Sequence, residues 1–491
     1  MAAASFIAMP RPVSAQQARG VRLSLSEALQ LAESRSEAVA VARAGVTRAT
    51  GQRFIARSQA MPQLSGTGGY TKTLKSQFEG LSGPAPDTTG PASLCTARIP
   101  AGATQAQRDA AIAQATTCKS GSGFDLSGAG FGAKNQWSVG VNASYNVFSG
   151  GRIAGQTQAA AAQERSATIE VESQRAQVKL DMAQAYYDAT LADKLVSIAE
   201  ASLAQTEDVL TQTKLGREVG DISEFELLRA QVTRDNQRPA LIQAKSNRDI
   251  AYLRLKQMLD VPLDDSLALS TTLDDATPAG AIDGAGTPAA GGHPSVADRA
   301  PVRQLEQAVI AQEGLLKAAR AERVPSFAII SGYQRLYFPN SFVPDFGKAR
   351  QNWTVGVSTN FPLFTGGRIQ GSTMVAQAGL DETRQRLRQT RDVAALDLRI
   401  AQSQLDQAQA AWMASAGTAE QARRALDIDQ LRYKEGISTQ TDLAQSRLLV
   451  EQAVVNRALA GRNLAVAKLR IQLLNDLPLQ LGGASQANPS R

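Results

Sequence analysis

Two segments of the chain alternate apolar and polar side chains with a period of two residues. From Trp137 to Val147 the odd positions carry Trp, Val, Val, Ala, Tyr and Val, whereas the even positions carry Ser, Gly, Asn, Ser and Asn. Residues 353–361 repeat this alternation. The pattern predicts strands with one apolar face. The segments at about 63–74 and 326–337 alternate less cleanly, and we expect each to pair with the strand that follows it.

Long stretches without proline follow each predicted hairpin. Residues 152–214 contain no proline and one internal glycine, which predicts a helix of about 90 Å at 1.5 Å per residue. A second such helix is expected over 368–431. Shorter helices, a return helix after each long one and a helix leading into each hairpin, are expected over 222–259, 438–474, 37–59 and 302–322. A return helix and a leading helix together nearly equal one long helix in length, so we expect them to stack end to end beside it.

The same unit occurs twice in the chain. Trp137 recurs as Trp353 at an offset of 216 (353 − 137), and the Gly150-Gly151 and Gly220 positions recur at the same offset. Upstream of the second strand the offset is 263, so the first copy carries 47 extra residues (263 − 216). An insertion of that size is tolerated in a surface loop.

The duplication gives the predicted domain organisation. The segments are a signal peptide (1–15), a first repeat (16–262), a Pro/Gly-rich linker (263–300), a second repeat (301–478) and a polar tail (479–491). The hairpins are expected at about 62–148, with a long loop over 76–135, and at about 325–364. The predicted fold class is α+β, mainly α, built from a tandem-duplicated helix-strand-strand-helix unit.

A membrane role would have to rest on the strands, because no window of about 18 apolar residues predicts a transmembrane helix. Strands of about ten residues with one apolar face fit the wall of a membrane barrel, although a soluble half-buried hairpin has the same local pattern. Four strands cannot close a membrane barrel, since the smallest has eight. An open edge in lipid leaves backbone groups unpaired. Several copies would therefore have to share one barrel.

Composition and charge exclude several other classes. The net charge is +7, but the arginines are scattered along helical segments, which indicates solvated faces rather than a nucleic-acid site. The chain has one histidine, His293, and shows no combined nucleophile and acid-base motif. We therefore expect no enzymatic activity, no metal and no cofactor.

The N-terminal segment and the two cysteines have features that are typical of exported proteins. Val13-Ser14-Ala15 precedes Gln16 as in a signal-peptidase site, while the missing basic start leaves a truncated signal peptide as the alternative to a complete one. Cys95 and Cys118 both lie in the Gly/Ser/Pro-rich insertion. A local disulfide is predicted for them, with two idle thiols as the alternative.

Glycines and tryptophans mark the ends of the predicted strands. Gly150, Gly151, Gly366 and Gly367 lie where strand becomes helix, and glycine there permits dihedral angles closed to other residues. Trp137 and Trp353 begin the second strand of each hairpin. They predict an aromatic girdle at a membrane interface, with ordinary packing as the alternative.

These features together resemble the TolC family of outer-membrane factors. The resemblance rests on the opening Leu23-Ser24-Leu25-Ser26-Glu27-Ala28-Leu29, the two Phe-x-Gly-Gly turns, and the Tyr433-Lys434-Glu435-Gly436 turn before Asp442-Leu443. It implies a homotrimer whose twelve strands close one outer-membrane barrel, continued by a helical coiled-coil barrel into the periplasm. The implied partners are further copies of the chain, a periplasmic adaptor, an inner-membrane pump of the RND or ABC type, and outer-membrane lipid.

The resemblance also implies a gate at the periplasmic tip. Tyr433 and Asp442 match the gate tyrosine and the constricting aspartate of the family, and Glu226 matches an acidic gate partner. On a threefold axis Asp442 would form a carboxylate ring that favours cations and raises its own pKa. Ser438 stands where an arginine is expected, and Gln445 stands where a second aspartate is expected. The turns at Gly220 and Gly436 are expected to dock the adaptor.

The implied function is an exit duct of a tripartite export system, with efflux of drugs or other small molecules as the commonest use of such ducts. Two alternatives remain open. The outer component of type I protein secretion has the same architecture, and a non-conducting trimeric coiled-coil scaffold explains the long helices but not the matched hairpins.

Overall fold

The structure is a computed structural model, and it describes residues 21–75, 99–116, 133–220, 222–271, 273, 295–339, 342 and 349–479. The chain forms two compact units. One comprises Met1–Phe54, Ala154–Lys317 and Gly371–Arg491, and the other comprises Ile55–Ile153 and Ala318–Gln370. Both repeats contribute to each unit, so the sequence repeats are not separate compact domains.

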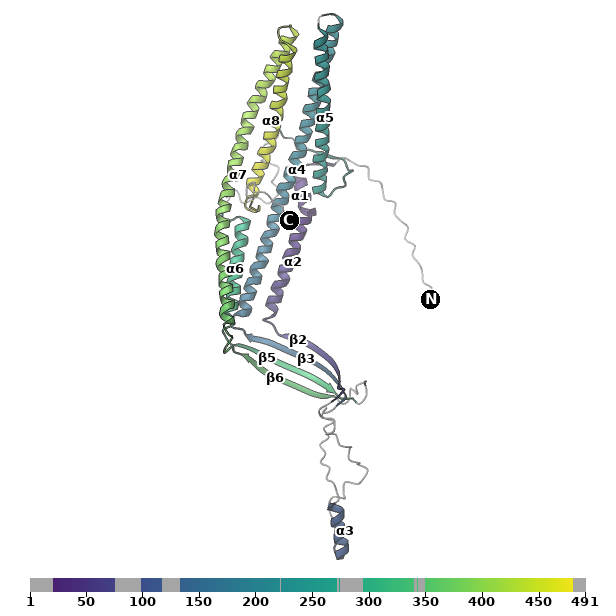
Figure 1. Cartoon of the computed structure of the whole chain (residues 1–491), viewed down its shortest axis with the longest axis vertical. Helices are drawn as coiled ribbons and strands as arrows, with labels where there is room; N and C mark the ends of the chain where they lie inside the picture. The colour runs from purple at the N-terminus through teal and green to yellow at the C-terminus, as the bar shows by residue number, and fades with distance from the viewer. Residues whose placement is uncertain are drawn as a thin grey trace, which may run out of the picture. The chain divides into compact units, whose positions relative to one another are not determined.

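The second unit contains a four-stranded antiparallel sheet (Figure 1). Its strands are β2 (Gln63–Lys72), β3 (Asn135–Phe148), β5 (Ser326–Tyr337) and β6 (Arg350–Asn360), in the order β2-β3-β5-β6. The two hairpins predicted from the alternation therefore join through β3 and β5. Strands β2 and β6 are left as edges.

The long insertion of the first repeat is not irregular throughout. The prediction of a loop over 76–135 is wrong in part, because helix α3 (Gln105–Thr116) lies within that span. Its sequence QAQRDAAIAQAT is rich in alanine and glutamine, which favour helix. The surrounding Gly, Ser and Pro residues hid this short helical segment from a reading by overall composition.

The first unit is built from long helices. Helices α4 (Arg152–Glu218) and α7 (Arg368–Lys434) each have 67 residues. They are followed by the return helices α5 (Glu224–Leu259) and α8 (Gln440–Leu473). The starts of both pairs preserve the offset of 216 residues (368 − 152 and 440 − 224). None of the helices in the described ranges is both long and apolar enough to cross a membrane.

Two 22-residue helices, α2 (Glu37–Ser58) and α6 (Ala300–Ala321), lead into the hairpins. The end of α8 meets the start of α6, because the Ala300 N–H donates to the carbonyl of Asn475 at 2.7 Å. In the first repeat Arg35, at the end of α1 (Leu25–Arg35), donates to the Asp260 carbonyl after α5 at 3.0 Å. In the second repeat, therefore, the return helix ends against the start of the leading helix, whereas in the first repeat the end of α5 contacts the end of α1, just before α2.

A buried charge cluster fastens the junction of α8 and α6 to α7. Arg299 has 1% of its surface exposed and donates to the carboxylate of Asp397 at 2.5 Å. Arg470 of α8 donates to the other carboxylate oxygen of Asp397 at 3.1 Å. Burial lowers the pKa of Arg299, and the Asp397 carboxylate opposes that shift. One carboxylate thereby fixes three helices at one point.

The main apolar core lies where α4 passes α1, α5 and α8. It includes Leu25, Leu180, Tyr186, Leu255 and Leu469. A small parallel pairing of β1 (Val21–Leu23) and β4 (Leu267–Leu269) adjoins it, and the Tyr186 hydroxyl donates to the carbonyl of Leu23 at 2.9 Å. The linker predicted over 263–300 therefore contains a strand, which its loop-like composition concealed.

Candidate functional site at the helical tips

Both return turns lie at the same end of the helical unit (Figure 1). Gly220 has φ +90° and Gly436 has φ +70°. At the second turn the Ile437 N–H donates to the Arg432 carbonyl at 2.8 Å, which closes the end of α7. A left-handed residue at this position favours glycine, because any side chain with a Cβ is strained there. The helices thus reverse at the two glycines singled out from the sequence.

The second tip begins with a reciprocal capping box. The backbone N–H and the hydroxyl of Thr439 donate to the Asp442 carboxylate at 3.0 and 2.8 Å, and the Asp442 N–H donates to the Thr439 hydroxyl at 3.3 Å. These hydrogen bonds hold the pKa of Asp442 below its ordinary value. Within one chain, therefore, Asp442 stays ionised and caps α8.

A second set of contacts joins α7 to α8 at this tip. The Asp429 carboxylate accepts a hydrogen bond from the Ser446 hydroxyl, and the Asp429 carbonyl accepts one from the Ser438 hydroxyl at 3.4 Å. Ser438, which occupies the position expected to hold an arginine, therefore links the two helices. Gln445 is exposed.

Sequence reasoning missed an arginine beside the predicted gate tyrosine. Tyr433 is half-buried against Val209, Leu426 and Leu443. Arg447 of α8 is half-buried nearby; burial lowers its pKa, while Tyr433 and Asp208 favour its charged form. The spacing of Arg447 from Leu443, four residues on one helix, could have placed both on the face that meets α7.

The first tip is capped differently. The Ser223 hydroxyl accepts from the Glu226 N–H at 3.3 Å, but the Glu226 carboxylate makes no return bond of the kind seen at Asp442. Its Oε2 atom is buried and has no hydrogen-bond partner among the described residues. The two tips are therefore unequal: the second has a closed capping box, and the first leaves a carboxylate oxygen unsatisfied.

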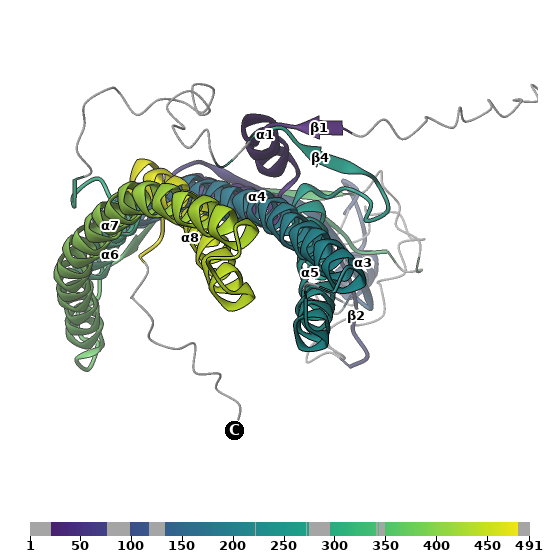
Figure 2. The same cartoon turned by 90° about the horizontal axis from the view of Figure 1, so that it is seen from above.

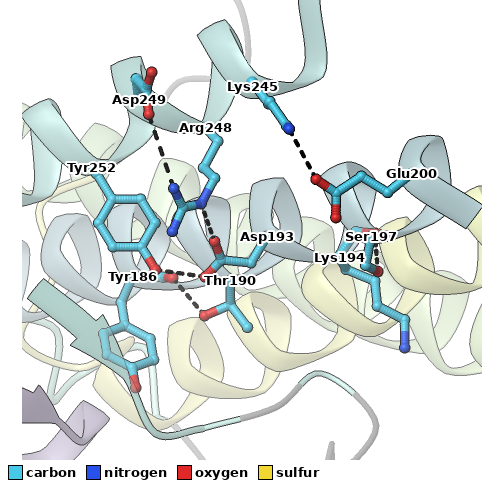
Figure 3. Close-up of polar contacts among 10 residues, drawn as sticks. All are labelled: Tyr186, Thr190, Asp193, Lys194, Ser197, Glu200, Lys245, Arg248, Asp249 and Tyr252. Carbon is cyan, nitrogen blue, oxygen red and sulfur yellow. Dashed lines mark hydrogen bonds and ion pairs between the residues drawn. The ribbon is translucent and has the colours of Figure 1, made fainter. Parts of the chain in front are cut away.

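Below the first tip, a cluster of charged and aromatic side chains joins the return helix α5 to the long helix α4 (Figure 3). The Asp193 carboxylate accepts from Arg248 and from the Tyr252 hydroxyl, both at 2.5 Å. The Arg248 guanidinium also lies 4.8 Å from the centre of the Tyr252 ring. Burial, followed by the bond to Asp193, raises the pKa of Tyr252. Lys245 adds an ion pair with Glu200 at 3.0 Å.

This cluster belongs to the first repeat alone. The positions 216 residues later are Gln409, Leu464 and Lys468, which cannot form the same acid-arginine-tyrosine cluster. The return helix α8 lies beside both long helices, as the view from above shows (Figure 2). It is fastened to α4 by Arg462, which donates to Asp188 at 2.8 Å. The duplicated backbone therefore carries different polar fastenings in its two copies.

The strand-to-helix turns contain the glycine pairs expected there. Gly150, Gly151, Gly366 and Gly367 all have positive φ. At Gly150 a Cβ atom would also lie 2.8 Å from the Cβ of Val324 and 2.9 Å from the carbonyl oxygen of Ala321. This turn therefore requires glycine for both its dihedral angles and its close packing. The Ser149 hydroxyl accepts from the Ile153 N–H at 3.4 Å and caps α4.

The two predicted girdle tryptophans differ in exposure. Trp137 contacts the rings of Tyr70 and Phe342, with centroids 4.9 and 5.7 Å away, and donates to the Phe342 carbonyl at 3.0 Å. Trp353 is 73% exposed and pairs across the sheet with Tyr333. Trp353 is in register with Tyr333 and Val141, four residues along β3 from Trp137, and a further aromatic pair, Phe148 and Phe327, lies at the opposite end of the sheet. The girdle therefore stays a prediction.

Some predicted features lie outside the described residues. They are the signal peptide, Cys95, Cys118, His293 and most of the polar tail. In the described ranges no three His, Cys, Asp or Glu side chains are grouped to hold a metal ion.

The fold and the tips define a class of protein: a duplicated hairpin-and-helix protomer, mainly α, whose sheet is open at both edges. The family model described as outer membrane efflux protein matches residues 28–260 and 295–475. The chain therefore belongs to the outer membrane efflux protein family, whose channels are transport conduits of the TolC type. No curated protein matches the sequence.

Solved structures agree with this assignment at the level of the fold. The CmeC outer membrane channel of Campylobacter jejuni has a TM-score of 0.68 and 15% identity, covering 93% of this chain and 86% of that one. VceC of Vibrio cholerae gives 0.65 and 16%, covering 92% and 95%. The open state of the MtrE channel of Neisseria gonorrhoeae gives 0.65 and 17%, covering 93% and 89%.

Proposed function

We propose that this chain is the outer-membrane exit duct of a tripartite export system. Three copies would close one barrel of twelve strands, four from each copy. Their helices would form a tunnel through the periplasm, where a periplasmic adaptor and an inner-membrane pump deliver the cargo. Two observations support this function: the family membership of the chain, and the exposed apolar face and open edges of its sheet.

The sheet is the observation that carries the proposal. One face presents apolar side chains to the outside: Val355 and Val357 of the edge strand β6 are 70% and 72% exposed, and Val139 of β3 is 54% exposed. The opposite face carries mainly Ser, Thr, Asn, Gln and Gly. An apolar outer face suits lipid, and a polar inner face suits a water-filled duct.

The open edges decide the oligomeric state. Strands β2 and β6 each pair on one side only, and their free backbone groups could not be left in lipid without partners. Pairing β6 of one copy with β2 of the next removes every edge once the ring closes. Three copies follow from the family resemblance.

The tips would form the periplasmic gate and the adaptor-docking surface. In a trimer Asp442 occurs three times around the axis, and mutual repulsion would oppose the lowering of its pKa by the cap. The packing of Tyr433 and Arg447 against the neighbouring helices would help to hold the second tip closed. The exposed turns at Gly220 and Gly436 would receive the adaptor.

Gel mobility and conductance test the duct directly. Detergent-extracted protein should migrate as a trimer without heating and as a monomer after boiling, and the trimer should conduct ions in planar bilayers. A soluble monomer without conductance would exclude the duct, whereas a trimer without conductance would favour the coiled-coil scaffold.

We propose efflux of small molecules rather than protein secretion, because the matching family is described by efflux. Deletion of the protein should raise susceptibility to drugs, dyes or metals and leave secreted proteins unchanged. Loss of a secreted protein with unchanged susceptibility would favour type I secretion instead.

A further inference from the structure

A cavity of about 540 Å³ lies among α4, α7 and α8, away from the tips. Lys194 of α4, Arg423 of α7 and Arg457 of α8 line it, together with Trp412, Leu273 and Val454. Cavities of this size hold small organic molecules. The lining thus combines three cations from three helices with an indole ring and aliphatic side chains.

The indole is held firmly in place. The Arg457 guanidinium lies over the Trp412 ring, 4.9 Å from its centre. On another side Gly461 makes room for the ring, since a Cβ there would lie 2.9 Å from Trp412 Cζ3. Stacking on the indole also fixes the plane of the guanidinium, which prepares it for bidentate recognition of an anion.

The positive charge that the cavity offers to a ligand comes from its two arginines. Within the described ranges neither Arg423 nor Arg457 has a carboxylate at ion-pair distance, whereas Arg384, Arg386, Arg391 and Arg424 of α7 each pair with a glutamate. Glu420 also lines the cavity, but its carboxylate accepts from Arg424 at 2.5 Å. An anion bound in the cavity would relieve the repulsion between these two arginines.

The side chains that line this cavity do not recur at the corresponding positions of the first repeat. The positions 216 residues before Trp412, Arg423 and Arg457 are Val196, Glu207 and Leu241. The first repeat therefore has neither the aromatic wall nor the two arginines at the corresponding places. The backbone geometry of the shaft is repeated, but these side chains occur in the second copy alone.

We infer that the cavity among α4, α7 and α8 binds a small organic anion, a carboxylate or phosphate carried on a flat apolar body. The anionic group would contact Arg423 and Arg457, and the flat body would lie against Trp412 and Leu273. This site is separate from the tips, so its failure would leave the proposed duct function untouched.

Titration of the full-length protein in detergent tests the site, with 4-nitrobenzoate as the probe and 4-nitrobenzylammonium as its cationic match. Calorimetry should show one 4-nitrobenzoate per chain, with weaker binding at high salt. The probe should also quench a share of the tryptophan emission that is missing in Trp412→Phe. The cation should not bind. Equal binding of both probes, or binding of neither, would overturn the inference.

Variants localise the binding. Arg423→Gln and Arg457→Gln should each weaken 4-nitrobenzoate about tenfold or more, as expected for loss of a charged hydrogen bond. Arg386→Gln is the matched control on the same helix, because Arg386 pairs with Glu382 and neither residue lines the cavity, and it should bind like the natural protein. Arg423 is exposed, so its substitution leaves the packing intact even if Arg457→Gln disturbs the fold. Unchanged affinity in Arg423→Gln would contradict the assignment.

Discussion

Asp442 combines a structural role in each chain with a proposed role on the trimer axis. Its carboxylate caps α8, and the hydrogen bonds from Thr439 lower its pKa. A lowered pKa in the folded state means that the cap stabilises the tip above the unfolded value of about 4. That stabilisation is lost as the pH falls through the lower folded value. The ionised carboxylate therefore contributes to the stability of the tip at neutral pH.

We expect amide exchange at the start of α8 to accelerate as the pH is lowered toward the pKa of Asp442, beyond the intrinsic pH dependence of exchange. Asp442→Asn should remove this additional acceleration. Hydrogen exchange with mass spectrometry measures it, and the first tip serves as an internal control because Glu226 makes no reciprocal cap. An identical pH response in the natural protein and in Asp442→Asn would show that the cap does not control the order of the tip.

A substitution at Gly436 tests the proposed role of the turn in docking the adaptor. Gly436→Val places a β-branched residue at φ +70°, where it is strained by about 1–3 kcal/mol. The tip should distort while the sheet, which belongs to the other compact unit, and the trimer remain intact. We expect lost export with normal amounts of heat-modifiable trimer. Normal export by this variant would remove the turn from the docking surface.

At the scale of elements, the two repeats place one aspartate in two environments. Asp397 lies in the buried cluster with Arg299 and Arg470, and the residue 216 positions earlier is Asp181. Asp181 has no arginine at the matching place before α2, where Ser36 stands, and accepts from Gln177 at 2.7 Å. Burial raises the pKa of Asp181. Its ionised form therefore opposes folding, whereas that of Asp397 is paired.

The matched substitutions should have different effects on the free energy of unfolding. Asp397→Asn leaves Arg299 buried without its anion and should cost about 3–5 kcal/mol. Asp181→Asn should be neutral or stabilising at pH 7, because it removes a charge that becomes unfavourable as the pH rises from the ordinary aspartate pKa through the raised one. Urea unfolding followed by helical circular dichroism measures both. Equal destabilisation would show that the two sites are energetically alike.

The sequence predicted those elements that repeat or have a long period. The starts of α4 and α7 follow from the constant offset, and the strands follow from strict alternation. Helix α3 and strand β4 were not predicted, because three to twelve residues inside a Gly/Pro-rich stretch carry little periodic signal. The pairing of β1 with β4 joins residues far apart in sequence, which local patterns do not encode. Arg447 was missed because its role depends on how α8 packs against α4 and α7.

At the scale of the whole molecule, the faces of the sheet should determine assembly. Val357 and Ser358 are neighbours on the edge strand β6, and both are exposed. Alternation places Val357 on the apolar face and Ser358 on the polar face. If the apolar face meets lipid, a charge at Val357 must be buried in hydrocarbon, while a charge at Ser358 meets water inside the duct.

We therefore expect Val357→Lys to reduce stability in the membrane by about 2–4 kcal/mol if the residue lies near the bilayer midplane. Heat-modifiable trimer should disappear from the outer-membrane fraction. Ser358→Lys, at the same height on the same strand, should still form trimers and instead change the ion selectivity of the conductance. The pair separates a lipid-facing surface from general damage to β6, because damage to the strand would remove trimers in both variants. The reverse pattern would place Val357 inside the duct and invert the proposed arrangement of the sheet.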